Sequence, residues 1–169
     1  MTTELVLFII LGLTAVGTGI AVITAKNPIY AVLYLVINFF SLAMFYLVLS
    51  AQFIAFLQVL VYAGAIMVLF LFVVMLLNLT GAIESVQDKL PAQKWIAAAL
   101  AVVLLLEFVA ISSASINANL PQKPTATFGT SKPVGELLYS NYVLPFEVTS
   151  LLLLIAMIGS VVLAKRRSG

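Results

Sequence analysis

The sequence predicts an all-α integral membrane protein, with five transmembrane helices forming a single membrane domain over residues 1–169. Two observations predict this class. Of the 169 residues, 64% are hydrophobic and only 8% are charged, whereas about a quarter of the residues of an average soluble domain are charged. The hydrophobic residues are also gathered into five long runs, each at or above the roughly 20 residues that a helix needs to cross a bilayer.

The first two runs are separated by a clear break. The first covers about residues 4–24 and follows "MTTE", which lacks the positive residues of a cleaved signal peptide, so we expect a retained helix. "AKNP" ends this run, because an Asn-Pro pair favours a turn. The second helix is predicted over about residues 29–49 and is followed by the short connection "SAQ". The second and third helices should therefore be antiparallel neighbours.

The third run, about residues 53–79, is longer than a membrane requires. At 1.5 Å per residue it would extend about 40 Å, against a hydrocarbon core of about 30 Å. We therefore expect it to tilt, kink or protrude. A polar loop that carries Glu84 follows it.

The last two helices are predicted over about residues 95–116 and 143–164. Trp95 begins the fourth helix, where an indole ring suits the membrane interface. Residues 117–141 are rich in Pro and Gly, so we expect an extramembrane loop between these two helices. Its "VGELLYSNY" segment could lie along the interface.

Basic residues predict the orientation. Cytoplasmic loops of membrane proteins carry an excess of Lys and Arg, so the more basic side should be cytoplasmic. This predicts an outside, periplasmic N-terminus and a cytoplasmic C-terminus, with residues 117–141 on the periplasmic side. The more basic side has Lys26, Lys89, Lys94, Lys165, Arg166 and Arg167, and the other side has Lys123 and Lys132.

Several functions are excluded by composition. The sequence has no Cys and no His, which excludes disulfides, thiolate nucleophiles, imidazole bases, and haem or zinc sites built on those ligands. We therefore expect no redox chemistry within this chain. The one basic cluster, residues 165–167, directly follows a hydrophobic run, so it indicates a cytoplasmic anchor and not a nucleic-acid surface.

Two carboxyl groups fall within predicted spans, where ionisable residues usually mark an ion pathway or a buried pair. Glu107 lies about 20 Å along the fourth helix from Lys94, and no Lys or Arg within a span could neutralise it. It must be protonated, face water or meet a cation from another chain. Glu147 lies in the first turns of the fifth helix, where an interfacial position and a proton-path role are equally open.

Gln58, Tyr62 and Gly64 interrupt the third hydrophobic run. Tyr62 is expected about 15 Å along the helix, near the middle of the membrane, and a straight helix would put Gln58 on the same face. Residues 63–65 form a small-residue patch that another helix could approach closely. Gly64 also lowers the cost of a one-residue π-bulge. Helix statistics alone favour the simpler interpretation of Gly64 as a packing residue.

Residues 58–79, "QVLVYAGAIMVLFLFVVMLLNL", resemble the signature third helix of a known family. It is the J-type membrane subunit of proton-pumping NADH:quinone oxidoreductase, respiratory complex I, the bacterial counterpart of mitochondrial NADH dehydrogenase subunit 6. "NPIYAVLYLVI" and "YVLPFEVTSLLLL" extend the resemblance over most of the chain. The "VYAGAIMVLF" core is its most specific part.

The resemblance implies a non-catalytic core subunit of the cell inner membrane that couples quinone reduction to proton translocation. FMN, iron–sulfur clusters and quinone would belong to other subunits. The implied partners are the quinone-site subunit, the antiporter-like subunits and lipid, with no nucleic acid. A π-bulge in the third helix would convert to regular α-helix and so open or close a water path.

The resemblance also implies roles for particular residues. Its switch segment falls on Tyr62, Ala63, Gly64 and Ala65, and its gate on Val68 and Phe72. Some relatives carry Glu where this chain has Gln58, so a role that needs a charge there lacks support. Among the carboxyl groups, the pattern Y-V-L-x-x-E favours Glu147 over Glu107, and Glu84 stands roughly where relatives place an acidic residue.

Two alternatives stay open at this point. The chain could be a related small membrane subunit of a multisubunit Na⁺/H⁺ antiporter or of a membrane-bound hydrogenase. It could also be a purely structural bundle that fills space and binds lipid.

Overall fold

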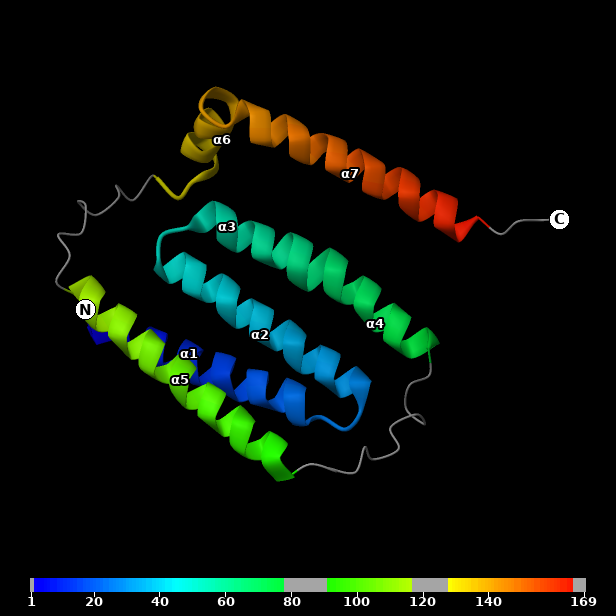
Figure 1. The fold of residues 1–169 in the computed structure, drawn as a ribbon. Coiled ribbons are helices and arrows are strands. Elements are labelled where there is room, and N and C mark those ends of the chain that lie inside the picture. Colours follow the sequence, from blue (N-terminus) through cyan, green and yellow to red (C-terminus); the bar gives the residue numbers. More distant parts are fainter. Residues whose placement is uncertain (1, 78–90, 117–127, 166–169) are drawn as a thin grey trace.

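The structure, a computed structural model, describes residues 2–77, 91–116 and 128–165, and within these ranges it contains helices and turns but no strand (Figure 1). Five of the described helical segments are long and apolar enough to cross a membrane. The predicted all-α membrane class with five spans is therefore confirmed. The helices are α1 (Thr2–Thr24), α2 (Pro28–Val48), α3 (Gln52–Leu57), η1 (Gln58–Ile66), α4 (Met67–Leu76), α5 (Pro91–Ile116), α6 (Ser131–Ser140) and α7 (Val143–Ala164).

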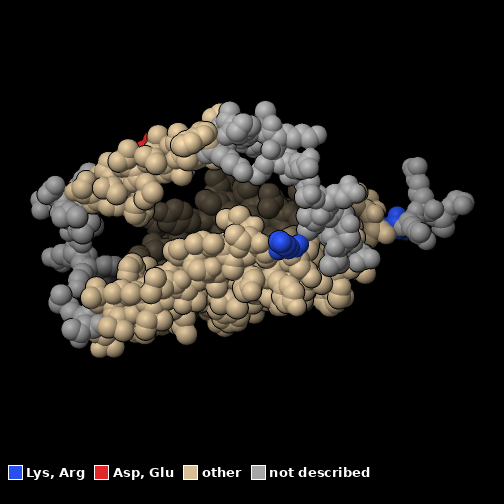
Figure 2. All heavy atoms as spheres, turned by 90° about the horizontal axis from the view of Figure 1, so that it is seen from below, with Lys and Arg blue, Asp and Glu red and all other residues tan. Residues whose placement is uncertain are grey.

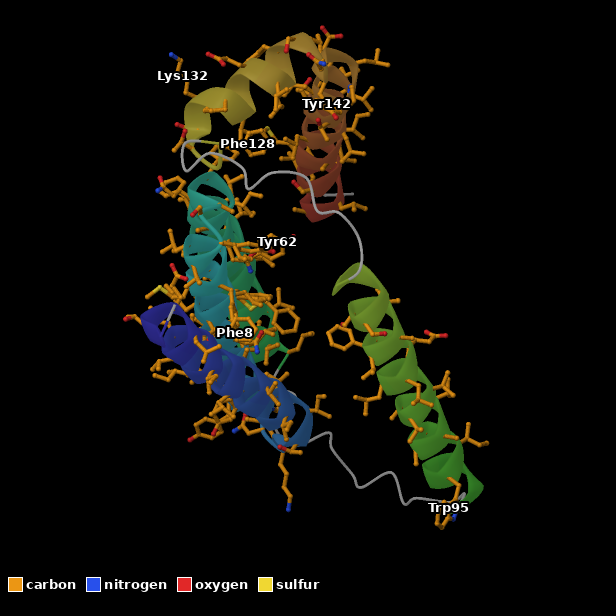
Figure 3. All side chains as sticks on the ribbon, turned by 90° about the vertical axis from the view of Figure 1, so that its left-hand side faces the viewer. Phe8, Tyr62, Trp95, Phe128, Lys132 and Tyr142 are labelled. Carbon is orange, nitrogen blue, oxygen red and sulfur yellow. The ribbon has the colours of Figure 1, made fainter. Side chains whose placement is uncertain are left out.

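The third span is built from three of these segments, since α3, η1 and α4 follow one another without a break from Gln52 to Leu76. The predicted loop of residues 117–141 contains the ten-residue helix α6. Lys132, in α6, and Trp95, at the start of the fourth span, lie at opposite ends of the molecule (Figure 3). Which end faces the cytoplasm stays a prediction.

Three spans form a layer in which α1 packs along α2, and α2 packs along α3, η1 and α4 (Figure 1). The predicted antiparallel pairing of the second and third spans is confirmed. A small core joins α2 to α4 around Val32, Met67 and Val74. Side chains partly buried against this core are Ile29, Leu35, Val36, Phe39 and Leu71.

The "AKNP" break acts as predicted. Asn27 is the N-cap of α2, and its Oδ1 accepts a hydrogen bond of 2.9 Å from the Ile29 backbone N–H. Pro28 occupies the first turn of α2, where its missing N–H would have had no partner within the helix. The capped start fixes where α2 begins and so sets its pairing with α1.

A polar contact holds α1 against α2. The Asn38 Nδ2 donates to the Ala15 carbonyl at 2.7 Å and to the Thr18 Oγ1 at 3.0 Å. The Thr18 hydroxyl in turn donates to the Thr14 carbonyl at 2.7 Å. A hydrogen bond between two helices in a membrane also fixes their relative register.

Replacing Asn38 with leucine is expected to weaken the packing of α1 on α2 by about 1 kcal/mol, the usual size of such a bond within a membrane. The midpoint of unfolding in mixed micelles measures this change. Ile37→Leu is the control, because it changes the neighbouring residue and keeps the hydrogen bonds. Equal midpoints for the two variants would contradict the assigned contact.

The helices α5 and α7 stand apart from the three-helix layer (Figure 3). Every side chain described from Trp95 to Ser113 of α5 is exposed, and α7 packs mainly on α6. A space-filling view shows a hollow between separate groups of helices, with very few charged residues on this face (Figure 2). Exposed apolar helices of this kind require lipid or other chains around them.

Candidate functional site

The third span is not a regular α-helix. Its middle part, Gln58–Ile66, is a π-helix of nine residues. At its start the Gln58 N–H is shared between the Ala55 and Ile54 carbonyls, so no π-type bond is formed there, and at its end the Met67 N–H is shared between the Gly64 and Tyr62 carbonyls. π-Helices are rare and frequently lie at functional sites. The predicted π-bulge in the third helix is confirmed, and the altered winding extends over nine residues.

The π-winding decides which side chains face the layer. The buried residues of the third span are Ala55, Gln58, Ala63, Met67 and Val74. From Gln58 to Ala63 the spacing is five, whereas a regular α-helix repeats its face every three or four residues. The extra residue between them is therefore accommodated by the π-helix.

This winding separates Gln58 from Tyr62. The sequence predicted that a straight helix would bring the two side chains to one face, but Gln58 is 7% exposed and Tyr62 is 46% exposed. The prediction fails because it assumed a regular helix. Ala63 takes the inward position that Tyr62 would occupy in α-helical winding.

Gly64 stands where a side chain would press on the backbone. A Cβ added to it would lie 3.3 Å from the Val59 carbonyl oxygen, a close contact that needs a small shift. The small-residue patch is also divided, since Ala63 is buried, Gly64 is half-buried and Ala65 is exposed. Only part of the patch is therefore used for packing within this chain.

Tyr62 packs on α2 through its ring. It meets Phe39 edge-to-face, with ring centroids 5.5 Å apart and an interplanar angle of 71°, and it lies on the side of the layer that faces α7 (Figure 3). Phe39 is not among the residues that the sequence pattern indicates. Counting equally in both directions from the short "SAQ" turn would have placed Phe40, the neighbour of Phe39, opposite Tyr62, because the turn sets the level at which the two helices meet.

Gln58 brings a polar group into this apolar face. Ser41, on α2, is the other buried polar residue in the part of the chain that the structure describes, at 5% exposed, and its hydroxyl donates to the Ile37 carbonyl at 3.1 Å. Since α2 packs along η1, the apolar packing of the second and third spans is interrupted by two buried polar side chains, one in the second half of α2 and one at the start of η1.

The two proposed gate residues lie on α4. Val68 and Phe72 are both exposed, at 50% and 54%. They therefore do not belong to the buried face of the third span in this winding.

The carboxyl groups lie apart from η1. Glu107 is exposed on α5 and Glu147 is exposed in the first turns of α7, and neither forms an ion pair within residues 2–77, 91–116 and 128–165. Glu84 lies outside the described residues. In the same ranges no group of three His, Cys, Asp or Glu could hold a metal ion.

Comparison with known proteins gives a consistent result. The family model described as NADH-ubiquinone/plastoquinone oxidoreductase chain 6 matches residues 18–163. NADH-quinone oxidoreductase subunit J of Escherichia coli (strain K12) is 40% identical over 152 residues, covering 89% of this chain and 81% of that protein. Subunit J of Pseudomonas aeruginosa is 40% identical over 153 residues, covering 86% and 87%. NAD(P)H-quinone oxidoreductase subunit 6 of the Paulinella chromatophora chromatophore is 36% identical over 164 residues, covering 97% and 79%.

Proposed function

The chain belongs to the family of NADH-ubiquinone/plastoquinone oxidoreductase chain 6, and from this premise we propose that its third span is the moving part that couples quinone reduction to proton translocation. It is a non-catalytic membrane subunit of NADH-quinone oxidoreductase. The antiporter, hydrogenase and purely structural alternatives are not favoured, because the relatives are named as subunits of this oxidoreductase.

The π-helix Gln58–Ile66 is the observation that carries this proposal. It holds one residue more than regular winding needs between Gln58 and Ala63, so it can rewind as α-helix without breaking the chain. Rewinding turns the helix beyond it by about 100°, the rotation of one residue. Two arrangements that differ by a local change of winding make a two-state element.

Rewinding would change the inward face in a defined way. With α3 held still, regular winding puts Tyr62 in the place that Ala63 now occupies. It also brings Phe72 to within about 40° of Gln58, while Val68 would lie about 80° away. Phe72 would therefore move further into the protein than Val68, and it is the stronger candidate for the gate.

An apolar ring is a suitable gate because a hydrophobic constriction stops water in a narrow pore. Movement of Phe72 and Tyr62 would make or break a water chain past Gln58. The Gln58 amide can hydrogen-bond such water but carries no ionisable proton. Proton-carrying groups would then be carboxyl groups, among which Glu147, Glu107 and Glu84 are the candidates in this chain.

Neighbouring subunits of the oxidoreductase would cover this chain and bind the redox cofactors. The exposed faces of α5 and α7 would be covered by the quinone-site subunit, by antiporter-like subunits and by lipid in the cell inner membrane. FMN, iron–sulfur clusters and quinone would be bound by other subunits; for the iron–sulfur clusters, this chain has no Cys or His ligand to offer. Quinone reduction there would bias the winding of η1. Any cation that pairs with Glu107 would have to come from a neighbouring chain, since no Lys or Arg lies within a span of this one.

Replacing Gly64 with alanine tests this function. Alanine is expected to favour the α-wound state, because its Cβ would press on the Val59 carbonyl in the π-helix. In reconstituted vesicles, protons pumped per NADH oxidised should fall while NADH oxidation continues.

The matched control is Gly17→Ala in α1, where an added Cβ meets nothing within 4 Å. This variant should pump at the wild-type ratio. Wild-type pumping and turnover in both Gly64→Ala and Gly64→Val would contradict the proposed switch.

A further inference from the structure

A backbone contact joins the start of the third span to a distant part of the chain. The Phe53 N–H donates to the Gly129 carbonyl at 2.9 Å. The first N–H groups of a helix have no partner within it, and the N-cap of α3, Ala51, forms no side-chain hydrogen bond. The Gly129 carbonyl therefore takes the place of a capping side chain.

Only glycine fits at position 129. A Cβ there would lie 1.8 Å from the Ser50 carbonyl oxygen and 2.9 Å from the Ala51 Cα. Both are backbone atoms, so neither can move aside as a flexible side chain would. The segment before α6 is thus seated directly on the turn between α2 and α3, and Phe128 lies beside the start of α3 (Figure 3).

The turn under this contact is itself well held. Ser50 has a φ of 60°, in the left-handed region. Its N–H donates to the Leu47 carbonyl at 3.0 Å, and the Ala51 N–H donates to the Tyr46 carbonyl at 2.8 Å. The contact thus joins a hydrogen-bonded turn to the start of α3.

On its other side the contact is tied to the last span. Gly129 is followed by Thr130, the N-cap of α6, and α6 packs on α7 through an edge-to-face contact between Tyr139 and Phe146, with centroids 5.0 Å apart. The start of α3 is therefore held from two directions, by the turn to α2 and by the corner of α6 and α7.

We propose that Gly129 is a positioning residue: its carbonyl holds the start of α3 still, so that rewinding of η1 turns α4. A change of winding rotates the two ends of a helix relative to one another, and the less restrained end takes up the rotation. With α3 held at Gly129, the rotation of about 100° is delivered to α4, which would turn Met67 and Val74 away from the core with Val32 as it turns Phe72 inward. This inference rests on the proposed function of η1.

Gly129→Ala tests the anchor in the intact reconstituted complex, with Gly135→Ala as its control. Gly135 lies in the neighbouring α6, and an added Cβ there meets nothing within 4 Å. Hydrogen–deuterium exchange in the peptide that contains Phe53 should be about fivefold faster in Gly129→Ala, from the loss of one hydrogen bond. Protons pumped per NADH should fall in this variant, and both values should stay at wild type in Gly135→Ala.

A second pair of variants removes the donor instead of displacing the acceptor. Phe53→Pro has no N–H at this position, and proline is tolerated in the first turn of a helix. Phe53→Ala is its control for the lost ring. If Gly129→Ala does not assemble, the two Phe53 variants test the anchor instead. Phe53→Pro is expected to pump fewer protons per NADH oxidised than Phe53→Ala.

Unchanged exchange in Gly129→Ala, or faster exchange with a wild-type pumping ratio, would overturn the anchor. Equal ratios for the two Phe53 variants would do the same. Gly64→Ala is measured alongside, to separate this result from failure of the proposed function. Reduced pumping in Gly64→Ala with normal pumping in Gly129→Ala rejects the anchor alone, whereas normal pumping in both rejects the switch.

Discussion

Deletion of Val61 is expected to abolish proton pumping while the complex still assembles. Removing one residue between Gln58 and Ala63 reduces their spacing from five to four, which suits a regular α-helix. The flanking helices α3 and α4 could then keep their present faces, with Ala55, Met67 and Val74 still buried. No surplus residue would be left to rewind, so the second state could not form.

The measurement is the number of protons pumped per NADH oxidised in reconstituted vesicles. The span shortens by only about 1.5 Å, so its membrane insertion should be preserved. The control combines the deletion with one alanine inserted directly after Gln58, which restores the spacing of five. Recovery of pumping in the control is expected, and wild-type pumping by the deletion alone would contradict a role for the extra residue.

The second large effect is expected from removing the ring of the proposed gate residue, Phe72, which should raise the proton leak of the vesicles. Phe72→Ala is expected to make vesicles leak protons in the absence of NADH, because the ring is the apolar group that closes the water path in the proposed mechanism. The leak should rise on the order of tenfold, corresponding to about 1.4 kcal/mol of barrier. Decay of an imposed pH gradient measures it.

Phe70→Ala is the matched control for this variant. It removes the same ring from the same helix, two residues away and therefore on a different face. Its vesicles should hold a pH gradient as the wild type does. Equal leaks in the two variants would show that loss of packing, and not loss of a gate, causes the permeability.

The membrane class and the five spans could be predicted from sequence because hydropathy and span length are local properties. The runs around residues 4–24 and 29–49 each exceed a bilayer in length, and "AKNP" separates them with its own N-cap and proline. No knowledge of the neighbouring helices is needed for either inference.

The position of the π-helix was accessible through Gly64 and through the resemblance of "VYAGAIMVLF" to a known family. Its effect on the faces was not. Helical periodicity assumes constant winding, so it grouped Gln58 with Tyr62, whereas the structure buries Ala63 with Gln58. In a π-helix the same face recurs after five residues, so the α-helical repeat of three or four residues assigns side chains to the wrong faces.

Gly129 was beyond sequence reasoning for a different reason. Its contact with Phe53 joins two segments far apart in the chain, and the sequence of residues 117–141 predicts only an extramembrane loop with one segment along the interface. Glycine in a loop is common, so the residue carries no local sign that a carbonyl oxygen of Ser50 leaves no room for a Cβ.

The winding of residues 58–66 is most directly measured by cryo-electron microscopy of the membrane-embedded complex, at rest and during NADH oxidation. We expect two classes that share the contact between Phe53 and Gly129. One class should keep Ala63 on the buried face, and the other should place Tyr62 there, with Phe72 turned toward Gln58. A single π-wound class under both conditions, with Ala63 always buried, would contradict the switch.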